Sequence, residues 1–112
     1  MSWPAYLELH RAGELEQRAK AAERLLEACR VCPRECLSQR LQGETGGCGV
    51  GDQAMVASYG PHFGEERPLV GSGGSGTIFL AHCNLCCVFC QNFEISQQDE
   101  GRIVSARELA GM

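Results

Sequence analysis

The length, composition and charge of the chain exclude several classes of protein. Its 112 residues are enough for one modest domain or for part of a larger one. Ten basic and fourteen acidic residues give a net charge of −4, without the basic cluster that nucleic-acid binding requires. No apolar run approaches the roughly 20 residues that span a bilayer, and the start lacks the pattern of a secretory signal. We therefore expect a cytoplasmic protein without nucleic-acid or membrane partners.

The first 28 residues are predicted to form an N-terminal helical segment, residues 1–28. Ser2 and Pro4 favour a helix start near residue 4. Gly13 is expected to divide the segment into a short and a long helix. Apolar residues then recur at three- and four-residue steps, which is typical of an amphipathic packing helix. This stripe comprises Leu15, Ala19, Ala22, Leu26 and Cys29.

Residues 29–76 are predicted to be a Cys/Gly-rich metal-binding extension. Four cysteines in this segment follow a C-x2-C-x3-C-x11-C pattern: Cys29, Cys32, Cys36 and Cys48. Four thiolates make a closed site, suited to structural zinc or to an auxiliary iron–sulfur cluster. The alternative is a loop of free or redox-labile thiols. Further along, residues 55–59 are predicted to form a short strand and residues 61–68 a loop.

Residues 77–112 are predicted to begin an α/β fold. The run 77–81 follows the glycine-rich turn 71–76, and its β-branched and aromatic residues are typical of a buried strand. Ser105 and Glu108 have the spacing of a capping box at the start of a helix. No second parallel strand follows, so we expect a truncated fold.

A second group of cysteines follows the predicted strand. Cys83, Cys87 and Cys90 have C-x3-C-x2-C spacing, with Phe89 before the last cysteine. Three thiolates can hold three irons of a [4Fe–4S] cluster and leave the fourth iron open for a small molecule, whereas ferredoxins use four cysteines. Cys86 is then a spare thiol. The alternative is zinc bound by all four thiols as two adjacent C-x2-C pairs, in a cramped geometry.

Several separated motifs resemble those of one family, in the same order. They are Cys-Arg-Val-Cys-Pro-Arg-Glu-Cys (29–36), Gly-Glu-Thr-Gly-Gly-Cys-Gly (43–49), Ser-Tyr-Gly-Pro-His-Phe-Gly-Glu-Glu (58–66), Gly-Ser-Gly-Thr-Ile-Phe (74–79) and Cys-Asn-Leu-x-Cys-Val-Phe-Cys-Gln-Asn (83–92). This set resembles the radical S-adenosylmethionine (SAM) superfamily, and most closely its pyruvate formate-lyase-activating-enzyme-like branch. The resemblance covers nearly the whole chain.

The resemblance implies an oxidoreductase in which SAM binds the open iron of the cluster. Reductive cleavage would give a 5′-deoxyadenosyl radical that abstracts hydrogen from a partner, which in activating enzymes is a glycyl-radical enzyme. Flavodoxin or ferredoxin would supply the electron. The resemblance also places Phe89 near the adenine and makes the strand 77–81 the first of a partial (β/α) radical SAM barrel. Because no Gly-Gly-Glu-type segment follows Cys90, the chain alone is expected to be inactive.

Overall fold

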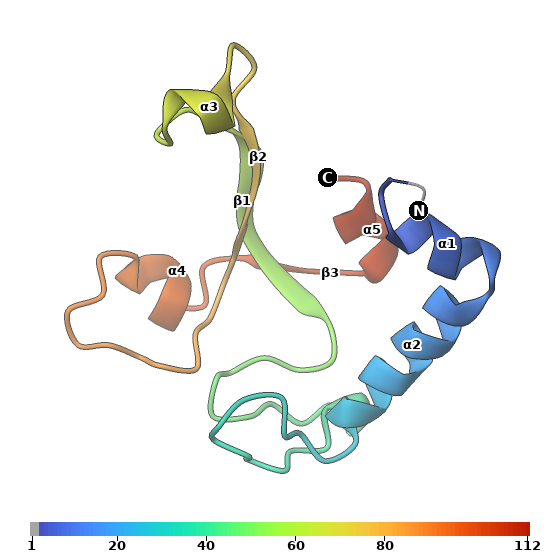
Figure 1. Ribbon diagram of the computed structural model, residues 1–112. Helices are drawn as coiled ribbons and strands as arrows, with labels where there is room; N and C mark the ends of the chain where they lie inside the picture. Colours follow the sequence, from blue (N-terminus) through green and yellow to red (C-terminus); the bar gives the residue numbers. More distant parts are fainter. Residues whose placement is uncertain (1–2) are drawn as a thin grey trace. The chain divides into compact units, whose positions relative to one another are not determined.

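The computed structural model describes residues 3–112 and has a mixed α/β fold (Figure 1). The chain divides into two compact units, Met1–Gly46 and Gly47–Met112. The segment boundaries predicted at 28/29 and 76/77 lie inside these units. We describe each unit by itself.

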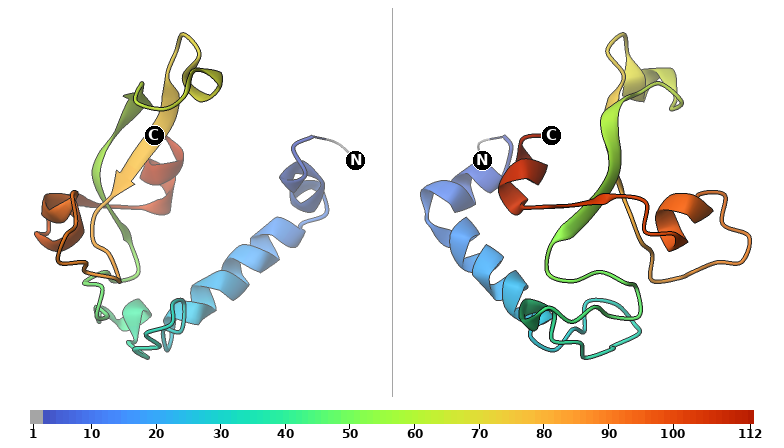
Figure 2. Two further views of the ribbon diagram at one scale, coloured as in Figure 1. Left: turned by 60° about the vertical axis from the view of Figure 1, so that its left-hand side comes forward. Right: turned by 180° about the vertical axis from the view of Figure 1, so that it is seen from behind.

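The first unit begins with two short helices that follow one another along the chain. Helix α1 spans Tyr6–Arg11 and α2 spans Glu14–Glu23, followed by the 3-10 turns η1 (Arg24–Leu26) and η2 (Arg40–Gln42) (Figure 2). Gly13 separates the helices with a φ of 72°, which confirms the predicted break. The first helix starts two residues later than predicted from Pro4, and Ser2 lies outside the described residues.

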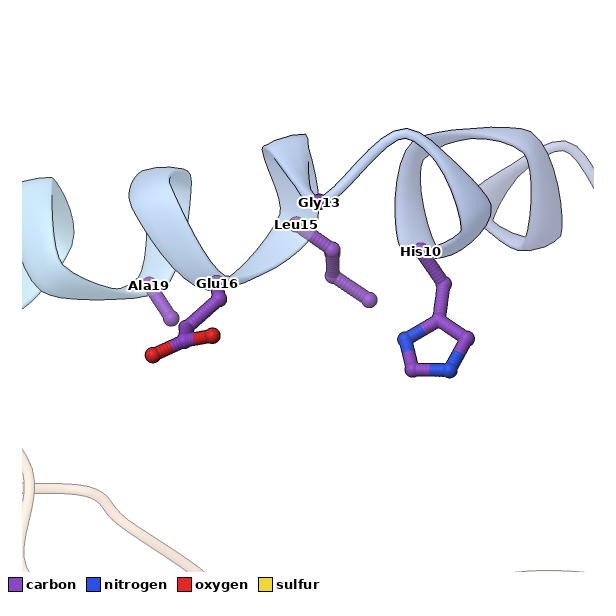
Figure 3. Close-up of a pocket in the computed structure, with 5 residues that line it drawn as sticks. All are labelled: His10, Gly13, Leu15, Glu16 and Ala19. Carbon is purple, nitrogen blue, oxygen red and sulfur yellow. The ribbon is translucent and has the colours of Figure 1, made fainter.

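The apolar stripe of the first unit is not packed as predicted. No residue of α1 or α2 is buried, and two exposed i,i+4 ion pairs, Arg18–Glu14 and Lys20–Glu16, add little stability. Figure 3 shows the side chains of Leu15 and Ala19 on the same side of the helices as those of His10 and Glu16. Together they line an open pocket. Cys29 is the one member of the predicted stripe that is buried. The lining residues of the pocket are His10, Gly13, Leu15, Glu16 and Ala19.

The second unit is built on a three-stranded antiparallel sheet of order β2-β1-β3. Strand β1 (Ala54–His62) is central, with β2 (Ser75–Leu80) on one side and β3 (Arg102–Val104) on the other. Both predicted strands are therefore confirmed. The loop predicted for residues 61–68 is partly wrong, because β1 continues to His62 and helix α3 (Arg67–Val70) follows it. In Figures 1 and 2, β1 and β2 run side by side as a long ribbon.

The core of the second unit lies where the three strands meet. Val56, Ala81 and Val104 are buried there, and the Ala81 amide extends the ladder by donating to the Met55 carbonyl at 2.8 Å. The prediction that 77–81 is a buried strand is wrong for all but Ala81. The apolar side chains of β2 remain exposed because the ribbon is a two-stranded extension beyond β3. The exposed apolar residues of β2 are Ile78, Phe79 and Leu80.

Two further helices lie in the C-terminal part, α4 (Phe93–Gln97) and α5 (Ala106–Ala110). The predicted capping box is confirmed at α5: the Ser105 hydroxyl accepts from the Glu108 amide at 3.2 Å, and Glu108 accepts from the Ser105 amide at 2.8 Å. Among residues 3–112, no helix is both long and apolar enough to cross a membrane.

The capping box makes the stability of α5 depend on pH. The Ser105 amide, then the Ser105 hydroxyl and Arg102, hold the pKa of Glu108 below its ordinary value of about 4.3. Because the pKa is lower in the folded state, the ionised carboxylate stabilises α5 above pH about 4.3. We expect this stabilisation to disappear as pH falls through the lowered pKa. Amide exchange in α5 measures it.

Glu108→Gln is expected to remove that pH dependence, whereas Glu100→Gln, at an exposed position, serves as the matched control. An α5 whose exchange rates respond equally to pH in both variants, after correction for intrinsic exchange, would contradict the assignment.

Candidate metal centres

The loop of residues 81–92 connects β2 to α4 and carries four of the eight cysteines. Its position at the C-terminal end of the strand agrees with the sequence prediction. Cys83, Cys87 and Cys90 are each partly exposed, so none of the three is buried in the core of the unit. The loop contains no helix or strand, only turns at residues 88–89 and 91–92.

Polar groups of the chain already lie against two of these sulfur atoms. The Leu85 amide donates to Cys83 Sγ at 3.4 Å, and Cys90 Sγ lies 3.3 Å from Ser96 Oγ. An amide or hydroxyl donor stabilises a thiolate more than a neutral thiol, because the hydrogen bond is charge-assisted. These contacts therefore suit sulfur atoms that act as metal ligands.

Helix α4 holds the cysteine loop in place. The His82 amide donates to the Ile95 carbonyl at 2.8 Å, and Gln97 Nε2 donates to the Cys87 carbonyl at 3.1 Å. Together with Ser96, these groups give three consecutive residues of α4 a contact with the loop. Sequence reasoning missed α4 and these supporting residues.

Cys86 differs from the other three cysteines of the loop. Its backbone is left-handed, with a φ of 52°, and its side chain is exposed. Its thiol donates to the Cys83 carbonyl at 3.2 Å. The Cys86 sulfur is thus engaged with the loop's own backbone.

His82 anchors the beginning of the cysteine loop. Its side chain is 9% exposed, and its Nε2 lies 3.0 Å from Asp99 Oδ1, without the angles of a hydrogen bond. Gly49 packs against the other side of the ring, where an added Cβ would lie 2.8 Å from His82 Nδ1. His82 is thus a packing residue at the start of the loop. The contributions of Gly49 and Asp99 had no signal in the sequence.

Three cysteines of the first group, Cys29, Cys32 and Cys36, lie on one loop of the first unit. Cys29 is buried; its amide donates to the Ser38 carbonyl at 3.1 Å, and its carbonyl accepts from the Leu37 amide at 3.0 Å. The Glu35 amide donates to the Cys32 carbonyl at 3.1 Å. Cys36 Sγ accepts hydrogen bonds from Ser38 Oγ at 3.2 Å and from Arg40 Nη2 at 3.7 Å. The fourth predicted ligand, Cys48, belongs to the second unit.

The two cysteine groups have the chemistry of metal ligands, but their side chains are not gathered into a metal site among the described residues. All eight cysteines lie within the described residues, and none forms a disulfide. Across residues 3–112, no three His, Cys, Asp or Glu side chains are gathered closely enough to hold a metal ion. The thiols and their hydrogen-bond donors are thus in place on short loops, and metal binding would require those loops to close.

Comparison with known proteins gives one informative similarity. No family model and no solved structure matches the chain. The chain is similar to the uncharacterized protein MJ0674 of Methanocaldococcus jannaschii, with 36% identity over 91 residues that make up 81% of this chain. It spans about a quarter (25%) of the length of that relative. The activity, cofactors and partners of the whole protein are therefore matters of proposal.

Proposed function

We propose that this chain is the cluster-binding part of a radical SAM enzyme, in which Cys83, Cys87 and Cys90 hold a [4Fe–4S] cluster. The observation that carries the proposal is a set of three partly exposed cysteines with C-x3-C-x2-C spacing on one loop, while the fourth thiol of that loop bonds to the backbone. The ordered motifs along the chain, which resemble activating enzymes of glycyl-radical enzymes, support the same function.

The number of thiols decides what such a cluster can do. Three thiolates leave one iron without a protein ligand, so that SAM can bind there by its amino and carboxylate groups. When bound, the cluster would supply the electron for reductive SAM cleavage. The chain's own contribution is to hold the sulfur atoms, through the Leu85 amide at Cys83 and the Ser96 hydroxyl at Cys90.

The surface of the loop suits a ligand with an apolar aromatic part. Phe89 is 86% exposed and lies next to Cys90, so its ring is accessible to an adenine. Stacking on an aromatic face is a common way to bind a base and is worth about 1–3 kcal/mol. Phe89 is therefore the proposed contact for the adenine of SAM.

The topology leaves room for the proposed partial (β/α) barrel. Strand β2 lies at the edge of the sheet, paired with β1 along one side only. Its other edge is able to pair with a parallel strand, as β2 would in a barrel. The cysteine loop follows the C-terminal end of β2, which is where barrel active sites lie. A glycyl-radical enzyme as substrate, and flavodoxin or ferredoxin as electron donor, belong to the same proposal.

The second part of the proposal is a structural metal at Cys29, Cys32, Cys36 and Cys48, either zinc or an iron–sulfur cluster. The close spacing of the first three thiols and the two donors at Cys36 support it. The competing function, a non-catalytic zinc or electron-transfer module, would use Cys86 as a fourth ligand of the second loop. The hydrogen bond from Cys86 to the Cys83 carbonyl favours the three-thiolate site instead.

Anaerobic reconstitution with iron and sulfide tests the proposal. In a variant whose Cys29, Cys32, Cys36 and Cys48 are serine, we expect about four irons and four sulfides per chain, held by the remaining loop. A colourless protein that takes up tightly bound zinc in place of iron would support the non-catalytic module.

A further inference from the structure

Arg40 is the one charged side chain that is buried among residues 3–112, with 5% of its surface exposed. A guanidinium group keeps its positive charge at every physiological pH. Its burial costs several kcal/mol unless negative charge and hydrogen-bond acceptors compensate. The surroundings of Arg40 therefore indicate where negative charge is expected in the first unit.

The guanidinium group is directed at a cysteine of the proposed structural metal site. Arg40 Nη2 donates to Cys36 Sγ at 3.7 Å, and Ser38 Oγ donates to the same sulfur at 3.2 Å. A neutral thiol is a weak acceptor, whereas a metal-bound thiolate carries negative charge and accepts strong hydrogen bonds. Two donors on one sulfur, one of them a buried cation, suit a thiolate.

Gly46, which belongs to the next cysteine motif along the chain, lies against both Arg40 and Cys36. A Cβ at this position would collide with Arg40 Nη2 and would lie 2.8 Å from Cys36 Sγ. Any side chain at Gly46 would therefore displace the guanidinium group from the sulfur. Glycine is required here by close approach.

We propose that Arg40 is a positioning residue and counter-ion for a thiolate metal centre at Cys36. The inference rests on the proposed metal site at Cys29, Cys32, Cys36 and Cys48. Zinc or an iron–sulfur cluster bound by several thiolates has a net negative charge, which the buried guanidinium compensates. Arg40 is thus the hydrogen-bonding partner that orients one ligand and lowers the free energy of the metal-bound state. The contact between Arg40 and Cys36 also argues against the alternative interpretation, a loop of free or redox-labile thiols.

Zinc competition against a chelator measures the effect, with the full chain and Zn²⁺ alone, in a background whose Cys83, Cys86, Cys87 and Cys90 are serine. We expect Arg40→Met to weaken zinc binding about tenfold or more, the size typical of groups that orient a metal ligand. Arg30→Met is the matched control, since it removes an exposed arginine next to Cys29 and should leave affinity unchanged. The same variants loaded with iron and sulfide show whether the centre is zinc or a cluster.

A glycine pair gives an independent test that does not alter any charge. Gly46→Ala is expected to weaken zinc binding as Arg40→Met does, whereas Gly51→Ala, where an added Cβ meets nothing within 4 Å, should not. In a Cys36→Ser background, Arg40→Met should have little further effect, because its partner is already lost. This non-additivity separates a direct action on Cys36 from general destabilisation.

The outcomes distinguish the inference from the proposal beneath it. Zinc affinity that Cys36→Ser leaves unchanged would overturn the metal site, and the inference with it. Affinity that falls with Cys36→Ser but is the same in Arg40→Met and the parent would overturn the role of Arg40 alone. If Arg40→Met weakens zinc binding equally in the parent and in the Cys36→Ser background, the role of Arg40 is purely structural. That result would also overturn the inference.

Discussion

Replacing Cys87 with alanine is expected to abolish the iron content of the loop that follows β2, whereas Cys86→Ala leaves it intact. The two cysteines are adjacent in sequence. Cys87 is a proposed cluster ligand, whereas the Cys86 thiol donates to the Cys83 carbonyl. Loss of one of three thiolates leaves two irons without protein ligands, so the cluster is lost. Iron and sulfide analysis after anaerobic reconstitution measures the difference.

The comparison is well matched because both substitutions remove one thiol from the same loop. A circular dichroism spectrum shared by the two variants before reconstitution establishes that neither has unfolded. Equal iron loss in both variants would contradict the ligand assignment and favour a four-cysteine site. Equal retention would place the cluster elsewhere.

Removing the metal proposed at Cys29, Cys32, Cys36 and Cys48 is expected to destabilise the first unit strongly. Within its described residues, 3–46, only Cys29 and Arg40 are buried, so there is almost no apolar core. A structural zinc contributes about 10–16 kcal/mol of apparent binding free energy at pH 7, most of which becomes folding free energy. We expect a chelator to increase amide exchange sharply across the cysteine loop of residues 29–46.

The second unit provides the internal control, since the buried side chains of Val56, Ala81 and Val104 give it a core of its own. In a background with serine at Cys83, Cys86, Cys87 and Cys90, the chelator should leave exchange in β1 and β3 unchanged. Amides of residues 29–46 that exchange at the same rate with and without chelator would contradict a structural metal in this loop.

Local signals predicted several elements of the fold correctly. Gly13 divides the helices, Ser105 and Glu108 form the capping box, and the strand before the cysteine loop lies where its β-branched run indicated. Each of these depends on interactions between residues close together in sequence, and such interactions can be recognised without a structure.

Other elements had no such signal. Strand β3 and helix α4 have three and five residues, too few for a periodic pattern. The pairing of β3 with β1 depends on residues about fifty positions apart in sequence. The apolar run of β2 suggested burial, but burial also requires a covering layer, and a sequence window does not show one.

The candidate sites divide in the same way. Cysteine spacing predicted both groups of thiols, because ligands from one loop must lie close together in sequence. The supporting groups were not predictable: Ser96 and Gln97 reach the loop from α4, and Arg40 is buried against Cys36 although arginine is usually exposed. Hydrogen bonds of this kind depend on the path of the folded chain.

The electron paramagnetic resonance spectrum of the reduced, reconstituted protein, recorded before and after addition of SAM, tests the three-thiolate cluster most directly. If Cys83, Cys87 and Cys90 are its only protein ligands, SAM binds the remaining iron and the spectrum changes. A cluster with full iron content whose spectrum is identical with and without SAM would contradict the account, because it would have no iron open to SAM.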